Sequence, residues 1–521
     1  MAEAEQTLLI KGGKVYDHTG DTDSPAAADV LIAGDTIAAV EPDLTARIEA
    51  GETHPALGGA PPGRVIHADD RLLVPGFVNA HYHSHDVLLK GCFETIHREA
   101  WLLNSLPPNY PQRSREELRA RTLLGALECL RSGITTVQDM CTVYPFDEGD
   151  IDVILDAYDE IGIRCVFAPQ IADVQGAALT PFWDEVVPAE FQSWLTGPAG
   201  GLGGHGELFD MICDVTRARR GRHRRITWAL GPTSPERSSP ELLAKLAELA
   251  ESDDLPVYTH INESRASTLA GRQLFGAYDG SLVRYLDDIG LLGPRLNLAH
   301  AVWMKPDEIE AIADASAMVI FNPLGNMKTR SGVAPIRQFL DAGVSPALGC
   351  DNCSCSDAQN MFLTMKMFTG LGAAIPSDPG PPFATDALAA ATVNGARTAR
   401  LEGEIGAIAP GMKADLIIID LTDLSFVPFN SAARQLVFTE SGRAVETVIV
   451  DGRVTLFEHR AKTIDEAALR QAVEDCMIVL RKDLKAVQAR TDTMEEYLLE
   501  AWRRAWAEDI GVERFVNSGR G

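Results

Sequence analysis

The sequence has no long hydrophobic run, although 45% of its 521 residues are hydrophobic. No stretch reaches the roughly 20 consecutive apolar residues that a membrane-spanning helix needs. The beginning, Met1 to Glu5, is acidic and has no basic segment of the kind that opens a secretory signal peptide. These absences predict a cytoplasmic protein with no membrane partner.

Basic residues are also in short supply. The chain has 47 lysines and arginines against 74 aspartates and glutamates, which gives a formal net charge of −27. Such a surface repels phosphate backbones, so we do not expect a nucleic acid partner. The expected partner is a small-molecule substrate. The nine cysteines are odd in number and scattered. They fit a reducing compartment better than a disulfide framework.

What the chain does have is a regular alternation of short β-favouring runs and longer helical patterns. A parallel α/β architecture produces this alternation. Eight such units are what a (β/α)8 TIM-type barrel requires, and we therefore predict that fold class. The eight expected strands are residues 72–83, 134–140, 164–171, 226–232, 257–262, 296–302, 318–323 and 346–351.

The segments on either side of the predicted barrel have a different pattern. Short strand-like runs with turns occupy both sides, so we expect the two chain ends to pair into a composite β-sandwich beside the barrel. Helical apolar spacing follows the second flank, and we interpret it as a capping or dimer-contact extension of a homodimer. The predicted domains are residues 1–74 and 406–462 for the sandwich, 75–405 for the barrel and 463–521 for the helical extension.

Residues 198–206 form the one low-complexity stretch, which is rich in glycine. They do not match the phosphate-binding pattern of a P-loop. We interpret this stretch as a surface insertion.

His81-Tyr82-His83 closes the first predicted strand. Side chains two residues apart on a strand point to the same face, so the two imidazoles project together. Neutral imidazole is a common ligand of zinc-like metals, and two of them supply half of a tetrahedral site. This pattern alone fits a pair of solvent-facing histidines equally well.

Further candidate ligands follow later strands. His260, His300 and Asp351 each lie at the C-terminal end of an expected strand, and Glu263 follows His260 by three residues. Active sites of βα barrels are built at this end of the strands. A lone buried histidine would be interpreted as a core residue, but four histidines and one aspartate at strand ends predict a metal site.

Cys350, Cys353 and Cys355 cluster around Asp351 and raise the alternative of a thiolate metal site. No second cysteine pair or nearby histidine completes four ligands. We therefore interpret the three cysteines as small pocket-lining or core residues.

Several motifs together resemble the amidohydrolase superfamily, in its cytosine-deaminase and triazine-hydrolase-like branch with the chlorohydrolases and S-adenosylhomocysteine deaminases. The resemblance covers nearly all of residues 7–460. It implies the same barrel and composite sandwich. The motifs that carry it are Pro-Gly-Phe-Val-Asn-Ala-His-Tyr-His at 75–83, Leu-Leu-Lys-Gly at 88–91, Leu-Arg-Ser-Gly-Ile-Thr-Thr at 130–136, His-x-x-Glu at 260–263, Gly-Leu-Leu-Gly-Pro at 290–294, Asn-Pro-Leu-Gly-Asn-Met-Lys at 322–328 and Pro-Gly-Met-Lys-Ala-Asp-Leu at 410–416.

The resemblance implies one divalent metal ion, Zn²⁺ first and Fe²⁺ or Mn²⁺ as alternatives. The implied ligands are His81, His83, His260 and Asp351. No lysine stands at the end of the fourth strand to carry a bridging carbamate, so a second metal is not expected.

The resemblance also implies the catalytic groups. His300 would contact the metal-bound water, and Asp351 and His300 would accept its proton. Glu263 would shuttle a proton to the substrate, as general acid–base catalysis requires. The alternative for Glu263 is a solvated carboxylate at a helix start.

Departures from the family pattern bear on the substrate. Residues 231–239 have no histidine where many purine deaminases of this branch carry one, which favours triazine and urea hydrolases over purine nucleosides. Gln170 stands where cytosine deaminases place a substrate-binding glutamine, and its amide can both donate and accept. Trp101 is a candidate for stacking on a ring, or a packing anchor.

These residues predict a metal-dependent enzyme that deaminates an amino-substituted heterocycle of pyrimidine, triazine or pterin type. The alternative reaction is C–N hydrolysis of a urea, carbamate or phenylurea. The non-enzyme alternative is a catalytically inactive scaffold of the same superfamily.

Overall fold

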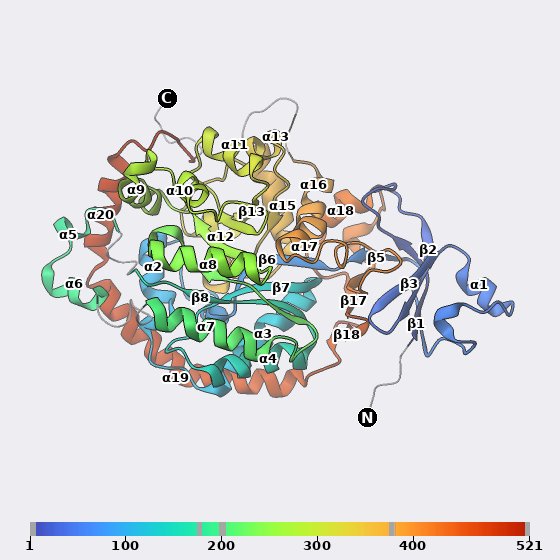
Figure 1. Cartoon of the computed structure of the whole chain (residues 1–521). Helices are drawn as coiled ribbons and strands as arrows, with labels where there is room; N and C mark the ends of the chain where they lie inside the picture. The colour runs from blue at the N-terminus through green and yellow to red at the C-terminus, as the bar shows by residue number, and fades with distance from the viewer. Residues whose placement is uncertain (1–6, 175–179, 197–204, 375–379, 381, 516–521) are drawn as a thin grey trace.

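A ring of parallel strands lies at the centre of the molecule (Figure 1). The computed structural model describes the chain apart from residues 1–6, 175–179, 197–204, 375–379, 381 and 516–521. The predicted insertion at 198–206 therefore lies mostly outside the described residues. The ring consists of β6 (Phe77–His83), β7 (Ile134–Cys141), β8 (Arg164–Ile171), β9 and β10 (Ile226–Trp228 and Gly231–Pro232), β11 (Val257–Ile261), β12 (Leu296–His300), β13 (Met318–Phe321), and β14 and β15 (Ala347–Leu348 and Asp351–Asn352).

Two seams close the ring. At the first, the Leu230 amide donates to the Pro256 carbonyl over 2.9 Å, and the Tyr258 amide donates to the Leu230 carbonyl over 2.8 Å. At the second, β15 pairs in parallel with β6, with Asp351 opposite Tyr82. The eight predicted strands thus form a closed parallel barrel, which confirms the TIM-type fold.

Helices follow the strands and cover the barrel (Figure 1). Serine caps fix the starts of two of these helices: the Ser114 hydroxyl accepts from the Glu117 amide, and the Ser239 hydroxyl from the Leu242 amide. The main helices are α2 (Arg98–Ser105), α3 (Arg115–Arg131), α4 (Glu148–Ile161), α5 (Trp183–Val186), α6 (Ala189–Thr196), α7 (His205–Arg219), α8 (Pro240–Ser252), α9 (Arg265–Leu274), α10 (Leu282–Asp288), α11 (Pro306–Asp314), α12 (Pro323–Lys328), α13 (Ile336–Asp341), α14 (Cys353–Ser356), α15 (Met361–Ala373), α16 (Ala384–Ala391), α17 (Val393–Thr398) and α18 (Ala432–Phe438). Among the residues that the structure describes, no helix is both long enough and apolar enough to cross a membrane.

A second sheet lies beside the barrel and is built from both flanks of the chain (Figure 1). Its centre is β5, which pairs with β1 on one side and with β16 on the other. A short helix, α1 (Leu44–Glu49), packs near β2. The nine strands are β1 (Thr7–Val15), β2 (Ala27–Ala33), β3 (Thr36–Glu41), β4 (Arg64–His67), β5 (Arg71–Pro75), β16 (Leu416–Asp420), β17 (Val445–Val450), β18 (Arg453–Phe457) and β19 (Arg460–Ala461).

The single strand predicted at 72–83 is in fact two strands in different sheets. The chain leaves the outer sheet at Pro75 and enters the barrel at Phe77. Gly76 makes the turn possible, because a Cβ there would lie 2.1 Å from the Thr135 hydroxyl oxygen. Hydrogen bonding joins all nine outer strands into one sheet, so the predicted two-sheet sandwich stays a prediction.

Removing residues 1–65 should destabilise the protein and make it insoluble. The deletion strips β5 of its partner β1 and takes Leu8, Ile10, Val30 and Ile32 out of a buried apolar cluster. Each such side chain contributes about 1.5–3 kcal/mol by burial. Solubility and the thermal unfolding temperature check this, with deletion of residues 1–6 as the control. A 1–65 deletion that stays soluble and unfolds at the parent temperature would contradict it.

The segment predicted to be a helical extension forms α19 (Glu466–Asp492) and α20 (Glu495–Ala507). α19 packs on α2 and α3, and α20 packs on α2, α5 and α9. In Figure 1, α20 lies on the side of the barrel opposite the outer sheet. The segment after α20 also returns to the barrel, where Arg514 donates to the carbonyls of Val302 and Met304 over 3.0 and 2.5 Å. The extension therefore holds the helices and loops that follow several barrel strands.

Candidate metal centre and cavity

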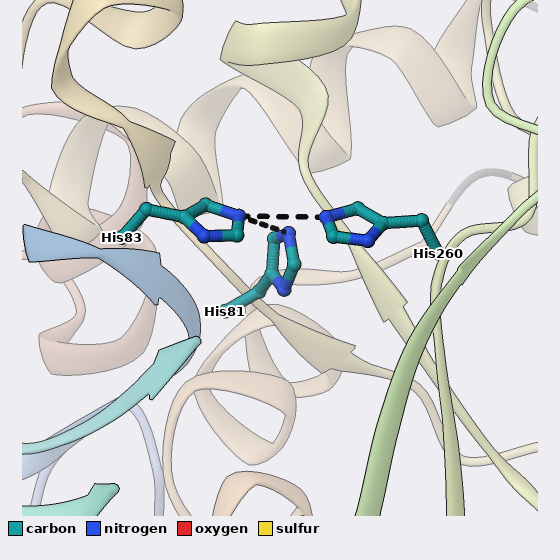
Figure 2. Close-up of side chains that lie close together, drawn as sticks. All are labelled: His81, His83 and His260. Carbon is teal, nitrogen blue, oxygen red and sulfur yellow. Dashed lines mark hydrogen bonds between the residues drawn. The ribbon is translucent and has the colours of Figure 1, made fainter. Parts of the chain in front are cut away.

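The predicted ligands meet at one point, at the C-terminal ends of β6, β11 and β15. The Nε2 atom of His83 lies 3.2 Å from that of His81 and 3.4 Å from that of His260 (Figure 2). One carboxylate oxygen of Asp351 lies 3.6 Å from Nε2 of both His81 and His83. Four side chains from three strands thus direct nitrogen or oxygen lone pairs towards one small volume.

His300 and Glu263 border the same volume. Nε2 of His300 lies 4.0 Å from the second oxygen of Asp351 and 3.9 Å from an oxygen of Glu263. The structure therefore brings together all six residues that the sequence singled out as ligands or catalytic groups.

In two of the rings, those of His83 and His260, a hydrogen bond on the far side fixes which nitrogen faces the other donors. The Nδ1 atoms of His83 and His260 lie 2.6 and 2.5 Å from the carbonyl oxygens of Met140 and Thr233. A carbonyl accepts but cannot donate, so Nδ1 carries the proton in these rings and Nε2 keeps its lone pair. Second contacts of this kind orient metal-ligating histidines.

Burial keeps the imidazoles neutral. It lowers the pKa of His83 to about 4 and that of His300 to about 3, and it holds the pKa values of His81 and His260 well below the usual range. Burial, with the nearby charge of Glu263, also raises the pKa of Asp351 to about 7. Neutral imidazole is the form that binds a metal ion.

The spacing of the donor atoms matches a tetrahedral metal site. Metal–ligand distances of about 2.0–2.1 Å in a tetrahedron place neighbouring ligand atoms about 3.3 Å apart. The separations of 3.2–3.6 Å around His83 are close to this value. The donor set of three imidazoles and one carboxylate therefore fits a zinc-like ion.

The backbone bends sharply where these strands end. Asn262, His300 and Asp351 have positive φ angles of 45°, 72° and 65°. A non-glycine residue in this region carries strain of about 1–3 kcal/mol, and such residues gather at functional sites. The bends turn consecutive residues out of the barrel wall, which places His300 and Asp351 at its mouth.

A cavity opens beside the donor atoms and is lined by both predicted substrate contacts. Gln170 accepts a hydrogen bond from the Thr142 hydroxyl over 2.7 Å, which leaves its amide NH₂ group for a ligand. Trp101 is buried, and its indole N–H donates to the Ser354 hydroxyl over 2.8 Å. Trp101 is thus anchored by packing while one part of it borders the cavity.

The sequence analysis missed two arginines and a histidine that line this cavity, Arg98, Arg237 and His85. Arg98 donates to a carboxylate oxygen of Glu263 and forms an ion pair with it. Its position three residues before Trp101 was an available signal, because residues three apart share a helix face. Arg237 lies within residues 231–239, a segment that stands out in the sequence only because it has no histidine.

The cysteine cluster is not part of the donor set. Among the described residues, the groups of potential ligands contain only histidines and Asp351. Cys350 and Cys353 are buried, and Cys355 lines the cavity with its thiol donating to the Asn352 carbonyl. The three cysteines occupy the core and cavity-wall positions that the sequence predicts for them.

Comparison with known sequences points to one family. The sequence profile of the Amidohydrolase family matches residues 72–455. A 5'-deoxyadenosine deaminase of Methanosarcina mazei is 31% identical over 402 residues, which cover 77% of this chain and 85% of that protein. A 5-methylthioadenosine/S-adenosylhomocysteine deaminase of Moorella thermoacetica is 32% identical over 412 residues, which cover 78% and 88%.

Solved structures agree with this. An adenosine deaminase from Xanthomonas campestris with bound zinc has a TM-score of 0.77 at 26% identity, covering 91% of this chain and 98% of that one. A triazine hydrolase from Arthrobacter aurescens has a TM-score of 0.76 at 22% identity, covering 91% and 99%. The second likeness is one of fold alone.

Proposed function

This chain belongs to the amidohydrolase family, and from that premise we propose that it is a metal-dependent hydrolase that removes an amino group from a nitrogen heterocycle. The observation that carries the proposal is that His83, His260, His300, Glu263 and Asp351 line one cavity, with His81 directly beside them. This set contains both a metal site and an acid–base carboxylate.

In this proposal His81, His83, His260 and Asp351 hold one divalent ion. Zinc is the first choice, because three imidazoles and a carboxylate in a tetrahedron suit it, and Fe²⁺ or Mn²⁺ would use the same donors. When bound, the ion lowers the pKa of a water molecule to about 7 and so supplies a nucleophile at neutral pH.

The side chains move the protons. Asp351 and His300, which face each other over 4.0 Å, accept the proton that water gives up. Glu263, which starts as a carboxylate, relays that proton to the ring nitrogen beside the carbon under attack. The second proton of the water then passes by way of Asp351 to the amino group, which leaves as ammonia. Water is consumed and the ring gains a carbonyl oxygen. The ion pair with Arg98 holds the Glu263 carboxylate at the cavity.

Two observations bear on which heterocycle is bound. Gln170 can pair with the edge of a pyrimidine, triazine or pterin, and Trp101 borders the same space. The curated relatives, however, are named for 5'-deoxyadenosine and 5-methylthioadenosine. Because of these names, we rank purine nucleosides beside the smaller rings as substrates. At the end of the fourth strand, the Thr233 carbonyl accepts a hydrogen bond from His260.

One screen tests the proposal on zinc-loaded protein. Ammonia release is measured from cytosine, isocytosine, pterin, an aminotriazine and 5'-deoxyadenosine, and aniline release from a phenylurea. Ammonia from any ring supports deamination. Aniline alone would favour the urea hydrolase, which the strand-four segment supports. No turnover by metal-replete protein would favour an inactive scaffold.

The domain division at residues 74, 405 and 462, the two-sheet sandwich, the homodimer and the cytoplasmic location belong to the same proposal. The sandwich is supported by the pairing of β5 with β16, which joins the two chain ends. The other three rest on sequence pattern and composition.

Gly325→Ala should weaken zinc binding without removing any ligand. Gly325 lies in α12, and a Cβ there would come within 2.6 Å of a carboxylate oxygen of Asp351. The carboxylate must move, and disturbing such supporting contacts costs about 10–100-fold in metal affinity. Competition with a zinc chelator measures the effect. The control is Gly370→Ala in α15, whose Cβ would meet no atom within 4 Å. Equal affinities in both variants would refute the expectation.

A further inference from the structure

Two guanidinium groups line the cavity, and only one of them has a counter-charge within it. Arg98 forms an ion pair with Glu263. Arg237 forms no ion pair with any residue that the structure describes, and its buried Nε has no hydrogen-bond partner. An unmet buried donor is destabilising, and more so when it is charged. Arg237 therefore brings to the cavity a charged group with a donor that a ligand can satisfy.

The backbone around Arg237 is fixed, so its side chain is held at the cavity. It ends a 3₁₀ turn, Pro235–Arg237, and its amide donates to the Ser234 carbonyl over 3.0 Å. Its own carbonyl accepts from the amides of Asp173 and Val174 over 3.2 and 3.1 Å. These bonds tie the loops after β8 and β10 together behind the guanidinium.

The charges of the cavity leave room for an anion. Arg98 and Arg237 balance Glu263 and Asp351, and the buried histidines are neutral. The carboxylate of Glu236 attracts Arg237 electrostatically, but it forms no ion pair with Arg237 and does not line the cavity. Burial and the charge of Arg98 lower the pKa of Arg237 to about 10, so it stays charged at neutral pH. A bound divalent ion adds two positive charges, which a negatively charged substrate would offset.

We propose that Arg237 forms a subsite for a carboxylate group carried by the heterocyclic substrate. The inference rests on the proposed deaminase function and specifies its substrate class. A guanidinium offers a planar fork of donors that matches a carboxylate with two parallel hydrogen bonds. Such charge-assisted hydrogen bonds are about twice as strong as neutral ones.

Equilibrium binding of product analogues tests the subsite without any turnover. Two matched pairs are used on zinc-loaded protein: uracil-5-carboxylate with uracil-5-carboxamide, and inosine-5'-carboxylate with inosine-5'-carboxamide. Each pair differs only in the charge of one group. We expect the carboxylate of at least one pair to bind at least about 10-fold more tightly than its carboxamide.

Arg237→Gln should abolish this preference while leaving the dissociation constant of the carboxamide within about threefold. Arg237→Lys keeps the charge but not the fork, and should retain only part of the preference. The matched control is Arg284→Gln, an equal loss of charge at an exposed residue that pairs with Asp279 and Asp307. Zinc content and thermal unfolding confirm that the variants are folded.

Equal binding of carboxylate and carboxamide in both pairs, or a preference that survives in Arg237→Gln, would overturn the subsite. Tighter binding of inosine-5'-phosphate than of the carboxylate would also overturn it in favour of a phosphate. The two proposals fail separately. Ammonia release from neutral rings with no carboxylate preference leaves the deaminase standing, whereas a carboxylate preference with no ammonia release from any ring leaves only the subsite.

Discussion

Glu263→Gln should lower the rate of heterocycle deamination by about 10²–10⁴-fold while zinc stays bound. Glutamine has nearly the same shape as glutamate but cannot deliver a proton to the ring nitrogen. The residue lies 3.9 Å from His300 and beside the metal ligands without being one of them. Steady-state rates on the best substrate, with zinc measured per chain, check the expectation.

The matched control for this variant is Glu99→Gln. Glu99 accepts a hydrogen bond from Ser264, the residue after Glu263, but it does not line the cavity. The control should keep a rate within a few-fold of the parent. A parent-like rate in Glu263→Gln, or a loss confined to urea hydrolysis, would remove Glu263 from the role of proton shuttle.

His83→Ala should empty the metal site and lower the rate by at least about 10³-fold, equivalent to about 4 kcal/mol of transition-state stabilisation. Its Nε2 is the donor nearest to the other three, at 3.2, 3.4 and 3.6 Å, so its loss opens the tetrahedron. Elemental analysis should find about one zinc per parent chain and almost none in the variant.

His67→Ala, which removes an exposed histidine of β4, should change neither metal content nor rate. A chelator should inactivate the parent, and added zinc should restore it. Active parent protein that contains no stoichiometric metal would contradict the metal site as a whole.

The barrel, and the convergence of the proposed ligands at its end, could be predicted because the signal is local. Each strand is a short apolar run, and the residue that ends it, such as His83, His300 or Asp351, is of a type that binds metals. Parallel strands of a barrel direct their C-terminal ends to one face. The local sequence of each strand is therefore sufficient to predict that the residues at the strand ends lie close together.

What the sequence could not predict depends on contacts between distant segments. The last barrel strand breaks into β14 and β15 around Gly349, where a Cβ would lie 2.5 Å from the Cβ of His81, on the neighbouring strand. Arg98 opens the short helix α2, and Arg237 ends a short turn far from it in the sequence, so no local pattern brings the two together. Their shared cavity becomes evident only once the loops are folded.

The contacts of the C-terminal extension have a consequence for synthesis. Arg514 bonds to Val302, two residues after His300, across 212 positions of sequence, and the ring of Trp502 lies 4.3 Å from that of His97 beside α2. Residues near the proposed catalytic groups therefore cannot make these contacts until a segment much later in the sequence has been synthesised. A nascent chain that already contains every proposed metal ligand still lacks these supports, so the order of translation delays their contacts until residues 502–514 have been made.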